Sequence, residues 1–319
     1  MTSDTTTVEW TDGARPSQRT PWRGALSRPE IAELLELHDA RSWLSLAVDW
    51  GLVFASFAVV AAWPNPLTIL AALFVIGARQ LGLAVLMHEA AHRTLLRDRR
   101  WNDFVGSWLC AYPVWSDLRT YRRYHLQHHA KNWTAEDPDL GLATKHPVTR
   151  ASMLRKISRD LSGRTGIKFA RAAFARTFRR WWVDEHARRA ARGVAVTNGV
   201  LLLSLAALGR PELYLLWAGA WLTTNTFVTR IRSIAEHNMV PDPADPLRNT
   251  RTTLARAWER LLVAPNRVNF HLEHHLLMTV PHYHLPRMHR LLAERGALDG
   301  ALVARGYPGV LRAAASKPA

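Results

Sequence analysis

The sequence predicts an all-α integral membrane protein in which four spanning helices form two hairpins that carry a helical cytosolic cap. Three observations predict this fold: four long apolar stretches, short and nearly uncharged turns within each pair, and a strongly basic segment between the pairs. A helix that crosses a bilayer needs about 20 mainly apolar residues, which these stretches reach or approach.

The four apolar stretches are predicted to be the spanning helices, at about residues 43–63, 67–87, 194–208 and 213–229. The turns 63–66 and 209–212 join them in pairs. Two buried hairpins of a soluble protein would give the same pattern, but such brief, nearly uncharged turns favour the membrane. Asp49 and Arg79 fall inside the first two stretches. Because a charge facing lipid costs about 3 kcal/mol, both should face the bundle interior.

The distribution of charge predicts the orientation. Residues 93–193 carry 22 Lys and Arg against 9 Asp and Glu, and such an excess marks the cytoplasmic side of a membrane. We therefore expect a multi-pass protein of the cell (inner) membrane with its cap and both termini in the cytosol. Residues 1–13 lack the basic and apolar regions of a secretory signal, in keeping with this orientation.

The composition limits which binding partners and which kinds of site are compatible with the sequence. The net charge of +16 suits anionic lipid or an acidic partner, and no nucleic-acid-binding motif accompanies it. The single cysteine, Cys110, excludes an intramolecular disulfide, a Cys-rich zinc site and an iron–sulfur cluster. We expect one domain at 27–305, preceded by a flexible tail at 1–26 and followed by a loosely ordered tail at 306–319.

Nine of the fifteen histidines fall in four groups along the chain. They are His88 and His92, then His125, His128 and His129, then His237, and then His271, His274 and His275. Positions i, i+3 and i+4 share one face of a helix, so each H-x-x-H-H box is expected to direct three imidazoles to one point. At this histidine content chance gives about 0.03 such boxes, and two are present.

So many converging imidazoles indicate a metal site, because without metal they would suffer desolvation or mutual repulsion. Nine ligands are too many for one ion but suit two ions with four or five nitrogens each. Imidazole binds iron, zinc, copper and nickel, so the residues alone leave the metal open. The remaining six histidines, among them His146, His282 and His289, are interpreted as ordinary structural residues.

At these boxes the chain resembles the membrane fatty acid desaturase and hydroxylase superfamily. The resemblance covers roughly residues 40–295, from His88-Glu89-Ala90-Ala91-His92 to the box that begins at His271. It implies a di-iron centre ligated by the nine histidines, and oxidation of an unactivated CH₂ group with dioxygen as co-substrate. Some relatives have an Asn four residues before the isolated histidine; Ser233 stands there in this chain, which puts a tenth contact in doubt.

The resemblance also implies the reaction and its partners. We favour desaturation of an acyl lipid or acyl thioester, with electrons from a separate ferredoxin or haem cytochrome. Hydroxylation, ketolation or oxidative decarboxylation of a lipid on the same scaffold remains the alternative. Ligating imidazoles usually donate their second N–H to a carboxylate or carbonyl. Glu89, Glu236 and Glu273 are the candidates for this role, followed by Asp137 and Asp139.

Readings from other classes fit the sequence less well. His88-Glu89-x-x-His92 matches the zinc peptidase pattern, with Glu89 as general base. A peptidase needs only three protein ligands and has no use for two further boxes. A soluble ferritin-like protein needs two Glu-x-x-His pairs, of which only Glu89–His92 is present. A non-catalytic metal carrier is the third alternative, and oxygen consumption by reduced protein with a lipid substrate would distinguish it.

Overall fold

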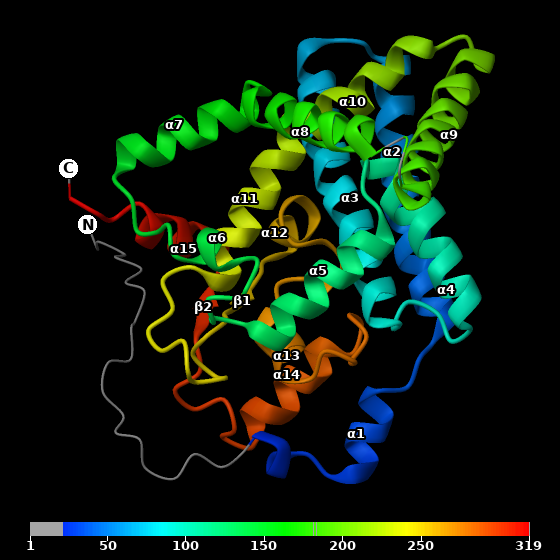
Figure 1. Ribbon diagram of the computed structural model, residues 1–319. Helices are drawn as coiled ribbons and strands as arrows, with labels where there is room; N and C mark the ends of the chain where they lie inside the picture. The colour runs from blue at the N-terminus through cyan, green and yellow to red at the C-terminus, as the bar shows by residue number, and fades with distance from the viewer. Residues whose placement is uncertain (1–21, 181, 183, 319) are drawn as a thin grey trace.

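The computed structural model describes residues 22–180, 182 and 184–318, so most of the tail predicted at 1–26 lies outside the described residues. The described chain is mostly helical (Figure 1). Its three longest apolar helices are α2 (Asp39–Ala62), α3 (Pro66–His92) and α9 (Glu185–Ala207). Within the described residues these three are long and apolar enough to cross a membrane. They contain the first three predicted spans except for residues 63 and 208.

The remaining helices are shorter and build the rest of the fold. The α-helices are α1 (Arg28–Leu34), α4 (Arg99–Val105), α5 (Leu118–Lys131), α6 (Leu140–Ala143), α7 (Arg150–Leu161), α8 (Arg164–Arg180), α10 (Tyr214–Leu222), α11 (Thr224–His237), α12 (Ala257–Leu262), α13 (His271–Leu276), α14 (Leu285–Glu294) and α15 (Tyr307–Ala314). Single turns of 3-10 or π type lie at Trp22–Ala25, Gly106–Ala111, Tyr112–Val114, Pro211–Leu213 and Pro265–Arg267.

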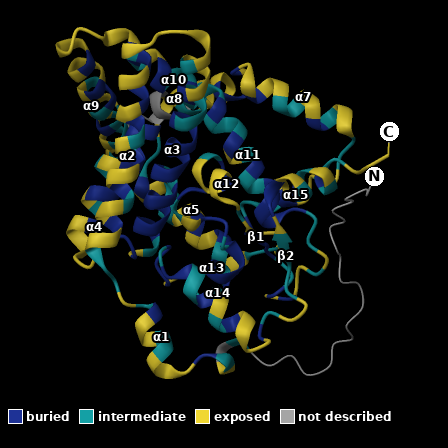
Figure 2. Ribbon diagram, turned by 180° about the vertical axis from the view of Figure 1, so that it is seen from behind, coloured by how far each residue is buried: buried dark blue, intermediate teal, exposed yellow. Residues whose placement is uncertain are grey.

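Helix α3 is the central element of the molecule. Asn65 caps its start, where the side-chain oxygen accepts hydrogen bonds from the backbone N–H groups of Leu67 (3.0 Å) and Thr68 (3.1 Å). The helix ends at Arg93, which adopts a left-handed conformation with φ of 62°. Between these ends α3 packs against α2, α10, α11 and α5, and it is more buried than α2 or α9 (Figure 2). A rigid, buried helix therefore carries the first histidine pair at its C-terminal end.

The fourth predicted span is not one continuous helix. It is divided at Thr223, with φ of −116° and ψ of −85°, into α10 and α11. The Thr223 hydroxyl donates to the carbonyl oxygen of Gly219 (2.6 Å), and the Thr224 hydroxyl donates to that of Leu73 on α3 (2.5 Å). Hydroxyls that bond back to helix carbonyls bend helices, which accounts for the break. Gly77 permits the close approach, because a Cβ there would lie 2.3 Å from the Thr224 Oγ1.

The C-terminal segment differs from its prediction. Residues 306–319 were expected to be loosely ordered, but Tyr307–Ala314 form α15, which packs against α11. Tyr307, Val310 and Ala314 are buried there and join a hydrophobic cluster with Val228 and Ile231 of α11. The apolar residues of this segment recur at helical spacing and give it one apolar face. Because this face packs against α11, the segment is ordered although its composition resembles that of a tail.

A small sheet supports the segment before the last histidine box. Strands β1 (Thr252–Leu254) and β2 (Val303–Arg305) pair in parallel, with Thr252 opposite Val303. Asn269, two residues before α13, is linked to Thr253 by a backbone bond of 2.9 Å and by a side-chain bond of 2.9 Å. The sheet thus ties α13 to the C-terminal part of the chain.

Candidate metal centre

The four histidine groups come together in the middle of the molecule, where α3, α5, α11 and α13 meet (Figure 1). His88 and His92 lie in the last two turns of α3, and His237 is the last residue of α11. Asp117 caps α5 by accepting from the backbone N–H of Thr120 (2.8 Å), and this helix presents the second box. The nine imidazoles are buried or nearly so, although they come from distant parts of the chain.

Five imidazoles form a first group, made of His88, His92, His125, His129 and His274. Their Nε2 atoms approach one another closely. The Nε2 of His274 lies 3.0 Å from that of His88 and 3.0 Å from that of His129. His125 continues the chain, with its Nε2 3.0 Å from His129 and 2.9 Å from His92. Two nitrogens bound at right angles to one ion, each at about 2.1 Å, lie about 3.0 Å apart, so this group fits a metal ion.

Four imidazoles form a second group, made of His128, His237, His271 and His275. One potential ligand atom from each of His128, His237 and His275 lies within 4.8 Å of the others, and the His271 Nε2 is 2.8 Å from that of His237. The Nε2 atoms of His128 and His275 are buried without a hydrogen-bond partner in the described structure. Such orphaned acceptors are what a bound cation would satisfy.

The boxes are divided between the two groups in a way that corrects the sequence interpretation. Each H-x-x-H-H box was expected to direct three imidazoles to one point. Instead His125 and His129 join the first group while His128 joins the second. In the last box His271 and His275 join the second group while His274 joins the first. Residues i and i+4 are about 40° apart around a helix, whereas i+3 and i+4 are about 100° apart, so one box faces two points.

Burial keeps these imidazoles in the form that binds metal. Loss of hydration lowers the pKa of every group member outside the long apolar helices for which a shift is resolved, and neighbouring imidazoles lower it further. These are His125, His129, His237, His271, His274 and His275. A neutral imidazole has a free nitrogen lone pair, whereas imidazolium has none. The site is therefore ready to accept a cation at neutral pH.

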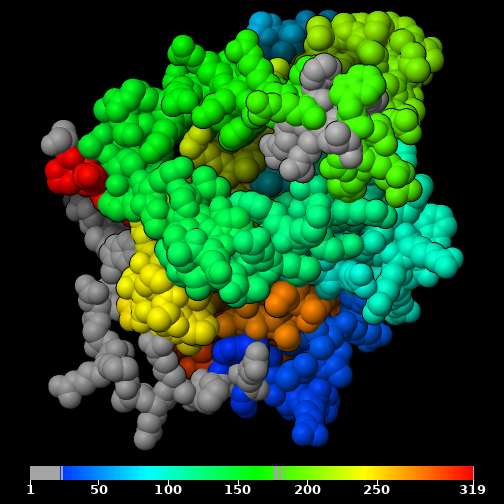
Figure 3. Space-filling view, viewed as in Figure 1, coloured from blue at the N-terminus to red at the C-terminus, as the bar shows by residue number. Residues whose placement is uncertain are grey.

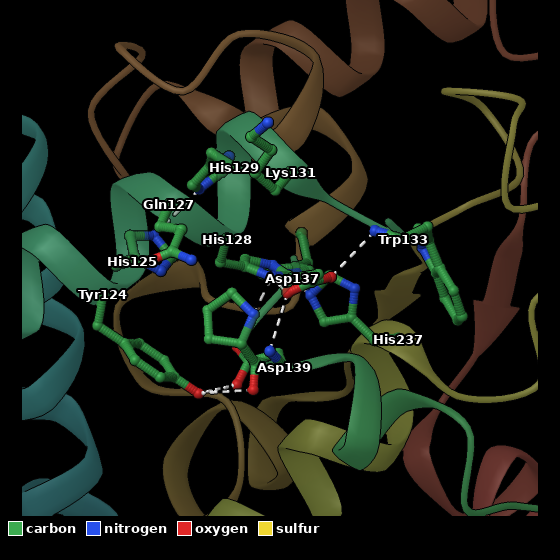
Figure 4. Close-up of polar contacts among 12 residues, drawn as sticks. Tyr124, His125, Gln127, His128, His129, Lys131, Trp133, Asp137, Asp139 and His237 are labelled. Atoms are coloured by element: carbon green, nitrogen blue, oxygen red, sulfur yellow. Dashed lines mark hydrogen bonds and ion pairs between the residues drawn. The ribbon is translucent and has the colours of Figure 1, made fainter. Parts of the chain in front are cut away.

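Asp137 makes the shortest contact between a carboxylate and a histidine of the boxes. Its Oδ1 accepts from the His128 Nδ1 at 2.8 Å and from the backbone N–H of Asp139 at 2.8 Å (Figure 4). Its Oδ2 accepts from the backbone N–H of Trp133 at 3.0 Å. With Nδ1 protonated and donating, the His128 Nε2 keeps its lone pair for a metal. From the sequence we ranked Asp137 below the three glutamates, because its position along the chain does not show that the chain folds back onto α5 there.

The three glutamates differ in what they contact. The Glu89 Oε1 lies 3.4 Å from the His88 Nδ1, and the Glu236 Oε1 lies 3.6 Å from the His271 Nδ1. Glu273 instead accepts a hydrogen bond from His289, at 2.6 Å. The structure thus brings two of the three candidates to box histidines and directs Glu273 to a histidine that sequence reasoning had set aside.

A basic cavity of about 520 Å³ lies between α5 and the start of α9. The surface is also hollowed between α5 and α8, as Figure 3 shows. Its lining residues are Arg119, Arg122, Arg123, Asp184 and His186. The Arg122 guanidinium also donates to the carbonyl oxygens of Ala90 (2.7 Å) and Ala91 (3.0 Å) in the last turn of α3. The cavity therefore borders the end of the helix that carries His88 and His92.

Comparison with known proteins agrees with this geometry. The family model for fatty acid desaturases matches residues 62–306. A dihydrorhizobitoxine desaturase of Bradyrhizobium elkanii is 26% identical over 92% of this chain and 91% of its own. Two matches are short. A beta-carotene 4-ketolase of Protosiphon botryoides is 34% identical over 24% of this chain and 20% of its own. A zeaxanthin 4-ketolase of Chlamydomonas reinhardtii is 40% identical over 23% and 17%.

The family match covers most of the chain and all nine histidines of the centre. Together with the apolar helices and the histidine groups, it establishes that the chain belongs to the fatty acid desaturase family and is an oxidoreductase of that type.

Proposed function

We propose that this protein is an oxygen-dependent membrane desaturase that removes two hydrogens from an unactivated C–C bond of a fatty acyl group. The acyl group would be carried as an acyl lipid or an acyl thioester. The observation that carries the proposal is the convergence of nine buried or half-buried imidazoles in two adjoining groups. The groups adjoin at His129 and His275, whose ring centroids are 4.3 Å apart.

Each group would hold one iron ion, so the nine histidines are the proposed ligands. Bound iron would supply the oxidising chemistry with dioxygen. The residues of the chain hold the imidazoles neutral and oriented. Asp137 keeps a proton on the His128 Nδ1, and Glu89 and Glu236 lie beside the Nδ1 atoms of His88 and His271. Burial of the groups excludes bulk water from the reacting carbon.

For the membrane arrangement we propose four passes in one domain, with α10 and the first part of α11 as the fourth. The basic segment 93–193 would face the cytosol, so the metal centre would lie at the cytosolic surface of the inner membrane with both termini on the same side. The apolar side chains exposed on the spanning helices, such as Leu44, Phe54 and Leu203, would then contact lipid.

Substrate and electron donor would both use the basic face. The cavity lined by Arg119 and Arg123 has the charge to bind a carboxylate or phosphate of the acyl carrier. Electrons would come from a separate ferredoxin or haem cytochrome, and an acidic donor would be attracted to the same positive surface.

Two alternatives have specific support. The short ketolase matches favour ketolation of a lipid on the same scaffold, with hydroxylation and oxidative decarboxylation as the related alternatives. The relative that aligns over almost the whole chain is named for dihydrorhizobitoxine, which favours a specialised small-molecule substrate. A zinc peptidase centred on His88 and His92 is disfavoured. Glu89, its required base, accepts instead from the backbone N–H of His282 (2.9 Å) and the Thr94 hydroxyl (3.1 Å).

The test compares lipids by mass spectrometry in cells that express the protein, a His274→Ala variant or neither. We expect new alkene-containing acyl groups with the wild-type protein alone, and two irons per purified chain. Acyl groups that gain an oxygen atom but no double bond would show that the reaction is hydroxylation or ketolation and not desaturation. Unchanged lipids with two bound irons would move the proposal to a small-molecule substrate, and one zinc per chain would overturn it.

A further inference from the structure

A buried ion pair links the two spanning helices α2 and α3. The Arg79 Nη1 donates to the Asp49 Oδ1 at 3.0 Å, and the two residues are 4% and 0% exposed. Both charges therefore face the bundle interior, as the sequence predicts. Gly82 makes room for the carboxylate, because a Cβ there would lie 2.5 Å from the Asp49 Oδ1.

The ion pair also holds the segment that leads into the last histidine box. The Asn266 Nδ2 donates to the Asp49 Oδ2 at 2.7 Å and to the carbonyl oxygen of Gly82 at 3.0 Å. Arg79 donates through Nη2 to the carbonyl oxygen of Leu261, near the end of α12. Both ends of the chain from 261 to 266 are thus fixed to the α2–α3 pair, five residues before His271.

The backbone conformation at Asn266 determines the direction that the chain takes after these contacts. Asn266 and Arg267 have φ of 50° and 60°, the left-handed region that asparagine tolerates better than most residues. Two consecutive left-handed residues reverse the chain sharply after Pro265 and send it toward α13. An asparagine serves here both for its backbone conformation and for its side-chain amide, which reaches Asp49.

Arg79 and Gly82 lie on the same helix as the first histidine pair, α3. Gly82 and His88 are six residues apart on α3, about 9 Å along a continuous helix. Whatever is fixed to Gly82 and Arg79 is therefore fixed relative to His88. His274 of α13 must meet His88 with an Nε2–Nε2 distance of 3.0 Å to complete the first group.

We propose that Asp49, Arg79 and Asn266 form a positioning network that sets the last histidine box against the histidines of α3. Within the described residues, the hydrogen bonds of these three side chains involve none of the nine box histidines, so the network would act through the path from Asn266 to α13. The proposal rests on the proposed function, in that the histidine groups hold metal.

The experiment measures metal binding by full-length protein in detergent, with Fe²⁺ per chain counted after dialysis and Co²⁺ affinity followed by absorption. Asn266→Gly keeps the left-handed backbone accessible and removes only the side-chain bonds. Asn266→Asp places a carboxylate against Asp49. We expect Asn266→Gly to bind metal about tenfold more weakly than wild type, and Asn266→Asp to bind it still more weakly.

The matched control is Asn225→Ala, because Asn225 of α11 also donates its side-chain N–H to an α3 carbonyl, that of Gly77 at 3.2 Å, but does not contact Asp49. Its metal affinity should equal that of wild type. A second pair guards against misfolding. Arg79→Gln leaves Asp49 without its cation and should weaken metal binding, whereas the double variant Asp49→Asn/Arg79→Gln restores a neutral hydrogen-bonding pair and should recover part of it.

The outcomes separate a positioning role from a merely structural one. Wild-type metal affinity in Asn266→Gly, with or without a lower unfolding temperature, would overturn the positioning role. Weaker metal binding at an unchanged unfolding temperature supports it. Failure of the wild-type protein to bind two metals would instead overturn the proposed function, and the network with it.

Discussion

The first and second histidine groups share the two H-x-x-H-H boxes but differ in the carboxylates that lie beside them. The first group contains the α3 pair, His88 and His92, and its Nε2 atoms pack directly against one another. In the part of the chain that the structure describes, Glu89 is the one carboxylate in ion-pair contact with it. The second group has Asp137 on His128 and Glu236 beside His271. More carboxylates therefore lie beside the second group, whereas the first group has two of its five imidazoles at the buried end of α3.

Each group also has an arginine bound to the carbonyl end of one of its helices. Arg251 is 2% exposed and donates to the carbonyl oxygens of Ala235 (2.9 Å) and Asn238 (3.0 Å), around the end of α11 where His237 lies. Burial lowers the pKa of Arg251 to about 10, which leaves it charged at neutral pH. Arg122 similarly bonds the last carbonyls of α3 but is also paired with Asp103. A cation at a helix C-terminus is stabilised by the helix dipole.

Removing one imidazole from each group should have the largest effect. We expect His274→Ala and His128→Ala each to reduce activity more than about 100-fold, because each removes a proposed ligand itself rather than its support. Iron per chain should fall below two in both, with membrane insertion intact. Full activity in either variant would remove that residue from the proposed ligands. Activity assays and elemental analysis of purified protein provide the check.

Asp137→Asn should affect the second group selectively. The amide can no longer hold the proton on the His128 Nδ1 as a carboxylate does, so we expect metal affinity to fall about 10–100-fold at one of two sites. Metal titration of the purified variant should then show one strong and one weak site. Glu136→Gln is the control, since Glu136 is exposed and pairs with Lys131. Equal weakening of both sites would refute the difference in how the groups are held.

Arg251→Gln should have a smaller effect, confined to the same group. The variant loses a charge-assisted contact with α11 carbonyls, and we expect about tenfold weaker metal binding at the site of the second group together with a lower unfolding temperature. Arg251→Lys keeps the charge and should lie between wild type and Arg251→Gln. Weaker metal binding confined to the site of the first group would contradict the inference that Arg251 supports the end of α11 where His237 lies.

His146→Ala should have the smallest effect. His146 is partly buried, and its Nδ1 lies 2.7 Å from the Asn238 Oδ1, one residue beyond His237. It belongs to neither metal group, so activity should stay within about threefold of wild type, the usual context-dependent scatter of one neutral hydrogen bond. A loss as large as that of Asp137→Asn would show that support for the second group extends through Asn238.

Much of the fold followed from patterns that depend on local chemistry. The long apolar helices α2, α3 and α9 were predictable because bilayer crossing requires long apolar runs. The break at Thr223 was not, since it depends on hydroxyl bonds that include one to Leu73 of another helix. The order of α15 depends in the same way on a partner surface, α11, that is distant in sequence.

The sequence by itself identified the nine histidines that could bind metal and predicted two ions, because so many histidines in boxes of helical spacing have few other uses. Only the tertiary structure decided how they are shared. His128 and His129 are neighbours in the chain but point about 100° apart on α5, so each faces a different group. Likewise only the folded chain brings Asp137 to His128 and Asn266 to Asp49, because these contacts close loops whose paths no local pattern specifies.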